Sequence, residues 1–93
     1  MNVSDRLARW VTRAFPPGSA PNVLQQLRDL PPEVICLQDP ERVQAALVLS
    51  SGGDWHRFQQ MRELAFQDWR DALVAADLAD ADWPERLAAV LDT

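Results

Sequence analysis

The sequence has 93 residues and a net charge of −5, and 47% of its residues are hydrophobic and 25% charged. These values argue against a second domain and against a disordered chain, so we expect one domain over residues 1–93. The acidic balance disfavours nucleic acid and anionic membranes as partners, because both bind proteins through cations that neutralise phosphates.

Helical spacing of apolar residues runs through almost the whole chain, and no stretch alternates apolar and polar residues long enough to predict a strand. The first helix is expected over about residues 4–14, with Ser4 as its N-cap and its end before Pro16. A second helix is expected after Ser19, which is suited to cap it, and ends before Pro31.

The third helix has the clearest start. Asp39 is a capping acid and Pro40 occupies the first helical position, which both favour a helix beginning there. Apolar residues then lie nearly all round the helix over residues 43–49, which is typical of a helix enclosed by others. We therefore expect this helix to be central and to end at Gly52 and Gly53.

A fourth helix is expected over about residues 55–67, with Asp54 as its cap. It either continues as one longer helix or breaks at Asp68, which is suited to cap a fifth, and the residues leave both open. The last helix begins near Asp82, with Pro84 in its first turn. The predicted fold is all-α: a compact, single-domain bundle of five or six short helices.

The sequence shows no recognisable catalytic set. Cys36 is the single cysteine and lies in an apolar link over residues 33–38, so we expect a small buried hydrophobic side chain. His56 is the single histidine and is expected on the solvent side at the start of a helix. A thiol dyad of these two residues is a weak alternative, because it needs them within reach of each other. We expect no enzyme and no cofactor.

Two other patterns resemble sites only superficially. Asp77, Asp80 and Asp82 cluster in one loop, but they lack the glycine and the ligand spacing of a calcium loop, so no metal is expected. The fourth and fifth helices could form a helix-turn-helix DNA reader. Residues 68–80, however, hold one arginine against four aspartates, so nucleic-acid binding remains the weaker alternative.

Four tryptophans are many for this length. Each lies near a helix start or on an apolar stripe, so we expect core anchors: Trp10, Trp55, Trp69 and Trp83. Interfaces also favour tryptophan, and Trp55 is the interface candidate because it follows the two glycines at a turn.

Arg62 falls on the helix face expected to be buried. A charge there needs a partner, and we predict an internal ion pair with Asp68 or Asp71, with an interface contact as the alternative. Together, Trp55, His56 and Arg62 are the predicted partner-binding residues.

Basic charge is concentrated at the start of the chain. Residues 1–30 hold four arginines against two aspartates, whereas residues 31–93 hold five arginines against twelve acidic residues. Arg6, Arg9 and Arg13 form a ridge on the first helix, which we expect to be solvated and to face the acidic C-terminal half.

Several short segments resemble a family of short uncharacterised bacterial proteins with no assigned activity. They are residues 41–46, 52–54, 68–71 and 82–87, and the likeness covers roughly residues 38–91. Members of that family have glycine at the position of Asp77, where a helix C-cap favours it. The resemblance implies a freestanding small bacterial protein and assigns no residue a role.

The leading functional expectation is a non-enzymatic protein-interaction or regulatory module. It rests on the tryptophan content, the acidic surface and the lack of catalytic groups. A homo-oligomeric structural protein is the alternative, in which self-association covers exposed apolar residues. With no apolar stretch of signal-peptide or membrane-span length, we expect a cytoplasmic protein and no membrane partner.

Overall fold

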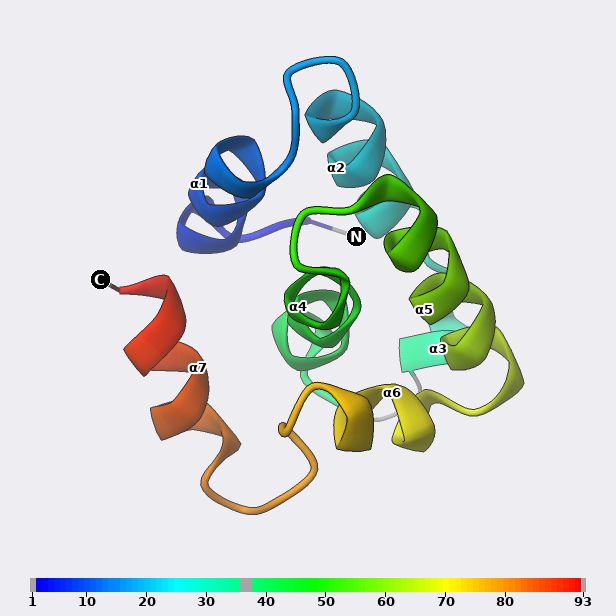
Figure 1. Cartoon of the computed structure of the whole chain (residues 1–93). Helices are drawn as coiled ribbons and strands as arrows, with labels where there is room; N and C mark the ends of the chain where they lie inside the picture. The colour runs from blue at the N-terminus through cyan, green and yellow to red at the C-terminus, as the bar shows by residue number, and fades with distance from the viewer. Residues whose placement is uncertain (1, 36–37, 93) are drawn as a thin grey trace.

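Helix α4 (Pro40–Ser51) lies at the centre of the molecule. The computed structural model describes residues 2–35 and 38–92, and Figure 1 looks almost along α4, with the other helices around it. Side chains are buried on every side of α4, as the apolar residues around it predict. The all-α class and the central position of this helix are confirmed.

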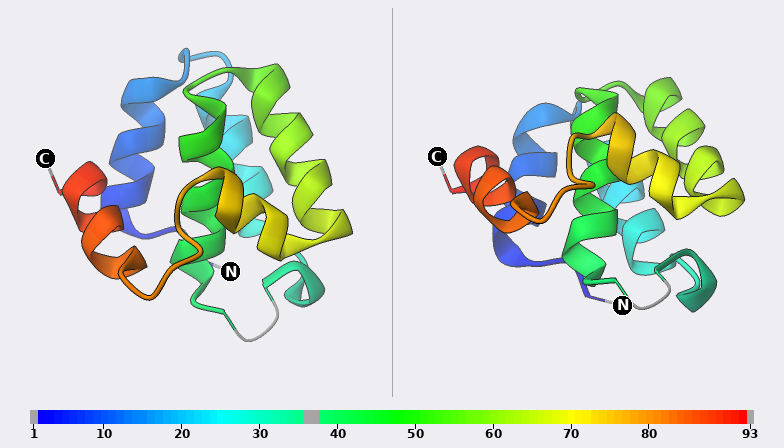
Figure 2. Two further views of the ribbon diagram at one scale, coloured as in Figure 1. Left: turned by 60° about the horizontal axis from the view of Figure 1, so that its bottom comes forward. Right: turned by 90° about the horizontal axis from the view of Figure 1, so that it is seen from below.

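The other helices, given in chain order, are α1 (Asp5–Ala14), α2 (Ala20–Arg28), α3 (Pro32–Ile35), α5 (Trp55–Gln67), α6 (Trp69–Ala75) and α7 (Trp83–Leu91). Figure 2 shows α1 and α7 on one side of α4 and α5 on the other. The described residues therefore hold seven helices rather than five or six. The additional one is the single turn α3, which forms within the expected link.

Polar N-caps define most of the helix starts. A side-chain oxygen accepts a hydrogen bond from a first-turn backbone amide at Ser4, Asp39, Asp54 and Asp68. Ser19 was expected to cap α2 but makes no such bond. Its hydroxyl donates to the Pro16 carbonyl instead.

The corner at Asp68 divides the fourth predicted helix from the fifth. Its backbone is extended, its N–H bonds to the Leu64 carbonyl at 2.8 Å, and its carboxylate caps α6. Asp68 thus ends one helix and starts the next, so the alternative of one continuous helix is wrong.

The turn between α4 and α5 approaches the end of α1 closely. Gly52 and Gly53 both have positive φ, which ends α4 as predicted. A Cβ atom at Gly53 would lie 2.3 Å from the Ala14 carbonyl oxygen, whereas one at Gly52 would meet open space. Gly53 therefore lets the backbone of this turn lie against α1.

Asp77 takes the left-handed conformation, with a φ of 61°, just after α6. Its N–H bonds to the Val74 carbonyl, and the N–H of Leu78 bonds to the Leu73 carbonyl, which together form a Schellman turn. Leu73 and Leu78 are both buried next to this turn. An aspartate thus occupies a position after the helix where glycine is favoured.

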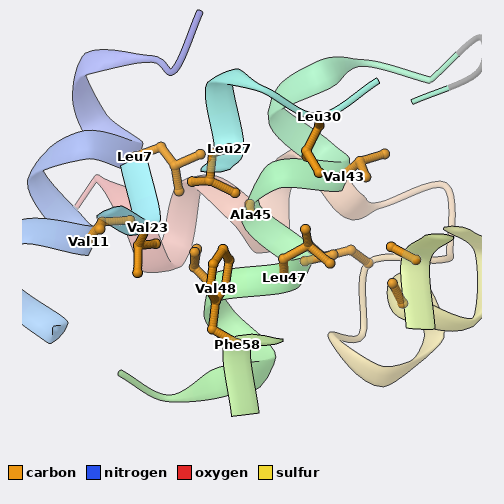
Figure 3. Packing of buried hydrophobic residues seen from close by; sticks show 14 of the residues in the cluster. Leu7, Val11, Val23, Leu27, Leu30, Val43, Ala45, Leu47, Val48 and Phe58 are labelled. Carbon is orange, nitrogen blue, oxygen red and sulfur yellow. The ribbon is translucent and has the colours of Figure 1, made fainter. Parts of the chain in front are cut away.

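One hydrophobic core joins the helices. Figure 3 shows its centre, where Leu7, Val11, Val23, Leu27, Leu47, Val48 and Phe58 come together. All four tryptophans are partly buried and pack against this core, which confirms them as anchors. Buried Gln44 donates to the carbonyls of Leu27 and Asn2, both at 3.2 Å, so it also ties the end of α2 and the N-terminal segment to α4.

Candidate interaction surfaces

The three predicted partner-binding residues lie on α5. Trp55 is half-buried, and its ring centroid is 6.1 Å from that of Phe58, whereas His56 is exposed. Trp55 and Arg62 are seven residues apart, so they share one side of the helix at a separation of roughly 10 Å along its axis. His56 points about 100° away from Trp55 around the helix. The structure therefore does not gather the three residues into one site.

The expected ion pair of Arg62 with Asp68 or Asp71 is absent among the described residues. The Arg62 guanidinium lies over the ring of Phe66, 4.7 Å from its centroid, and its Nε is buried without a hydrogen-bond partner. Asp68 is unavailable because it caps α6 and pairs with Arg70 at 3.0 Å. The prediction was wrong because cation–π stacking one turn along α5 takes the place of a charge partner.

Phe66 belongs to a small set of exposed large apolar residues. Phe66 is 46% exposed, Val74 67% and Val90 40%, and they lie on α5, α6 and α7 respectively. Phe66 and Arg62 line one shallow hollow. The hollow beside Phe66 is lined by neither Val74 nor Val90, so the three exposed side chains do not share one groove.

The acidic loop between α6 and α7 is partly neutralised within the chain. Arg86 pairs with Asp82 at 2.8 Å and also with Asp77, and its hydrogen bond to Asp82 raises the pKa of its guanidinium. Within residues 2–35 and 38–92, no three His, Cys, Asp or Glu side chains are grouped to hold a metal ion. Asp82 precedes α7 but makes no side-chain capping bond, since its carboxylate accepts a hydrogen bond from Arg86 instead.

Cys36 lies outside the described residues, so its expected burial and the weak alternative of a thiol dyad with His56 are both untested. The described helices include none that is both long enough and apolar enough to cross a membrane.

The predicted basic ridge on α1 divides into two parts. Arg6 donates to both carboxylate oxygens of Glu41, at 2.9 and 2.6 Å, and to Asp92 at 3.0 Å. The hydrogen bond from Arg6, with a further one from the Ser4 hydroxyl, holds the pKa of the Glu41 carboxyl below its usual range. Arg6 thus joins α1 to α4 and to the residue after α7, and it does face acidic residues as expected.

Arg9 and Arg13 form the other part of the ridge. Both are exposed, and neither guanidinium makes an ion pair or hydrogen bond within the part of the chain that the structure describes. They lie four residues apart, so both charges project from the same side of α1.

Two shallow hollows lie next to each other on this part of the molecule. The first is lined by residues of α1 alone, Arg9 and Arg13 among them, and the second, of about 470 Å³, is lined by Thr12 together with residues of the connector and of α2. The two hollows share Thr12 and form one surface. We call it the α1–α2 groove, and its lining residues are Asp5, Ala8, Arg9, Thr12, Arg13, Pro17, Ala20, Pro21, Leu24, Gln25 and Arg28. Small and apolar side chains form most of its surface, while three arginines and a single aspartate supply its charges.

The sequence analysis identified the arginine ridge but not the groove. The second hollow combines Thr12 of α1 with residues of α2, and the packing angle of the two helices is not encoded in the spacing of either one. The small residue Ala20 was the available signal, since small side chains leave hollows between packed helices.

Comparisons of the chain with known protein families, curated proteins and solved structures found no match.

Proposed function

We propose that this chain is a non-enzymatic protein-interaction module that binds a partner protein through the α1–α2 groove. The supporting observation is the combination of an apolar floor with two exposed arginines that have no partner among the described residues. Protein interfaces favour an apolar centre and are enriched in arginine relative to the rest of the surface.

The α5 residues remain a second proposed contact surface. Arg62 and Phe66 present a stacked cation and aromatic ring, a pairing that interfaces favour. Trp55 has less free surface to offer, because much of its ring is already engaged with the core. We therefore place the α1–α2 groove first.

A groove-filling variant tests this function. Thr12→Trp places an indole where the two hollows meet, and Gln60→Trp is its control, since it adds the same side chain at an exposed position in the middle of α5. The tagged parent and both variants are used to capture proteins from lysate of the source cells, with mass spectrometry as the readout.

We expect a protein retained by the parent and by Gln60→Trp and lost by Thr12→Trp. If all three forms retain the same protein equally, that protein binds outside the groove. Circular dichroism of each variant checks that the helices are intact.

Self-association is the second candidate function. The exposure of Val74 and Phe66 favours it, because a second copy could cover these side chains. It predicts a thermal midpoint that rises with protein concentration, whereas a monomer has a constant midpoint. The nucleic-acid alternative gains no support from α6, whose exposed residues include Asp71 and Val74 beside Arg70.

A further inference from the structure

We infer that the α1–α2 groove takes a short acidic amphipathic helix of a partner protein, with apolar side chains on the groove floor and carboxylates beside Arg9 and Arg13. This inference rests on the proposed function and adds the chemical class of the partner segment.

The floor of the groove suits an inserted apolar side chain. Ala8, Thr12 and Ala20 are small, and Leu24 is half-buried and supplies an apolar wall. Larger side chains from a partner can therefore enter between the helices and lose water contact there. An amphipathic helix presents such side chains at intervals of three and four residues, which is the common pattern of helix-in-groove recognition.

The length of the groove limits the size of the partner segment. Helix α1 has 10 residues, so it extends about 15 Å. A partner helix lying along it contacts the floor over about three turns. A segment of about 14 residues supplies those turns with its capping residues.

Charge selects an acidic segment over a basic one. Arg9 and Arg13 lie along the α1 edge, and neither has a carboxylate partner among the described residues. Asp5 is the one acid of the lining and lies in the first turn of α1, so carboxylates are best placed toward the Arg13 end. An arginine and a carboxylate form short, charge-assisted hydrogen bonds.

The remainder of the protein strengthens this selection. Residues 31–93 carry a net charge of −7, so an acidic segment is repelled elsewhere and attracted to the groove. The lining has no aromatic side chain on which nucleic-acid bases could stack, and its floor is aliphatic. An acidic protein segment therefore fits both the floor and the edge better than a phosphate backbone does.

A display library of random 14-residue segments tests the inference. Binders are selected on the parent protein and depleted on Thr12→Trp, so that only segments seated in the groove remain. We expect the enriched segments to be net negative, with apolar residues spaced three and four apart. Enrichment of basic or neutral segments, or no groove-dependent enrichment at all, overturns the inference.

The charge contribution is measured with the most enriched segment as a synthetic peptide. Arg9→Gln combined with Arg13→Gln is expected to weaken its binding about five- to tenfold, and added salt to weaken binding to the parent. Unchanged affinity would show that the arginines do not select the segment. As a competing outcome, groove-dependent binding of a 20-residue DNA strand or phosphatidylserine vesicles would assign the arginines to phosphate and overturn the inference.

The lysate experiment separates the two proposals. A protein lost by Thr12→Trp together with a library that favours basic segments leaves the interaction function standing and removes only the acidic partner. No capture through the groove and no groove-dependent library binder removes both.

Discussion

The start and the remainder of α1 use arginine in opposite ways. In the first turn Arg6 is bound by Glu41 and Asp92, whereas further along the helix Arg9 and Arg13 have no partner among the described residues. One ridge in the sequence thus supplies both a structural clamp and a free charged edge. The residues that the neighbouring helices place opposite each arginine decide which role it takes.

Arg42 on α4 extends the structural set. Its Nε donates to the Leu78 carbonyl at 2.9 Å and its Nη2 to the Ala79 carbonyl at 3.0 Å. The guanidinium also lies 5.3 Å from the ring centroid of Trp83. We call Arg6 and Arg42 the clamp arginines, and Arg9 and Arg13 the groove arginines.

The largest loss of stability is expected from a substitution that pushes α1 away from the turn between α4 and α5. Gly53→Ala brings a Cβ into the Ala14 carbonyl, so we expect it to lose about 3 kcal/mol of unfolding free energy. Gly52→Ala, with open space around it, is the control and is expected to lose about 1 kcal/mol. Urea unfolding measures both, and equal losses would contradict the close approach of this turn to α1.

Removing a clamp arginine is expected to have the next largest effect. Arg42→Met keeps the aliphatic stem but leaves two carbonyls without their charged donor, which is expected to cost about 2 kcal/mol. Arg57→Met is the control, because Arg57 is exposed on α5. If urea unfolding gives both variants the parent's stability, the hydrogen bonds of Arg42 do not hold the loop between α6 and α7.

The Arg6 clamp predicts a pH dependence. Folding lowers the pKa of the Glu41 carboxyl, so its stabilisation is complete above the ordinary glutamate pKa of about 4.3 and is lost as pH falls through the folded value. At pH 7 we expect Glu41→Gln to be about 1 kcal/mol less stable than the parent. That gap should narrow below about pH 4.3. A gap that stays constant from pH 7 to pH 3 in urea unfolding would contradict the clamp.

Arg86 lies between the two sets, since it is paired but exposed. Asp77→Gly removes one of its carboxylate partners but relieves the left-handed backbone at residue 77, so we expect a gain of about 0.5 kcal/mol. Asp77→Asn is the control, because it removes the same charge and keeps a side chain that tolerates this conformation. Thermal unfolding ranks the two variants, and a lower midpoint for Asp77→Gly than for Asp77→Asn would refute the assignment of strain.

The smallest effect on stability is expected at the groove arginines. Arg9→Gln with Arg13→Gln breaks no described bond, so the unfolding free energy should stay within about 0.5 kcal/mol of the parent. A larger loss in urea unfolding would place these arginines among the clamps.

Local chemistry made the helix boundaries predictable. Asp39 with Pro40, Asp54 and the Gly52-Gly53 pair act within a few residues of where they stand, so their effects follow from sequence alone. Ser19 is the exception, because its hydroxyl donates to the Pro16 carbonyl and accepts no hydrogen bond from a first-turn amide of α2.

The candidate sites depended on contacts between distant residues and were harder to predict. Arg62 was placed correctly near the buried face of α5, but its stacking on Phe66 required knowing that Asp68 was already used at the corner. To predict the α1–α2 groove, one would have to know how α1 and α2 pack on each other across the connector over residues 15–19. Neither relation leaves a periodic signal in the sequence.

Partner retention by the Arg9→Gln and Arg13→Gln double variant tests the central claim most directly. The double variant and Arg57→Gln, which removes one exposed arginine from α5, are compared with the parent in capture from source-cell lysate. We predict that the double variant stays folded with the parent's stability and retains several-fold less of the partner, while Arg57→Gln retains as much as the parent. Full retention by the double variant would contradict the assignment of the α1–α2 groove as the binding surface.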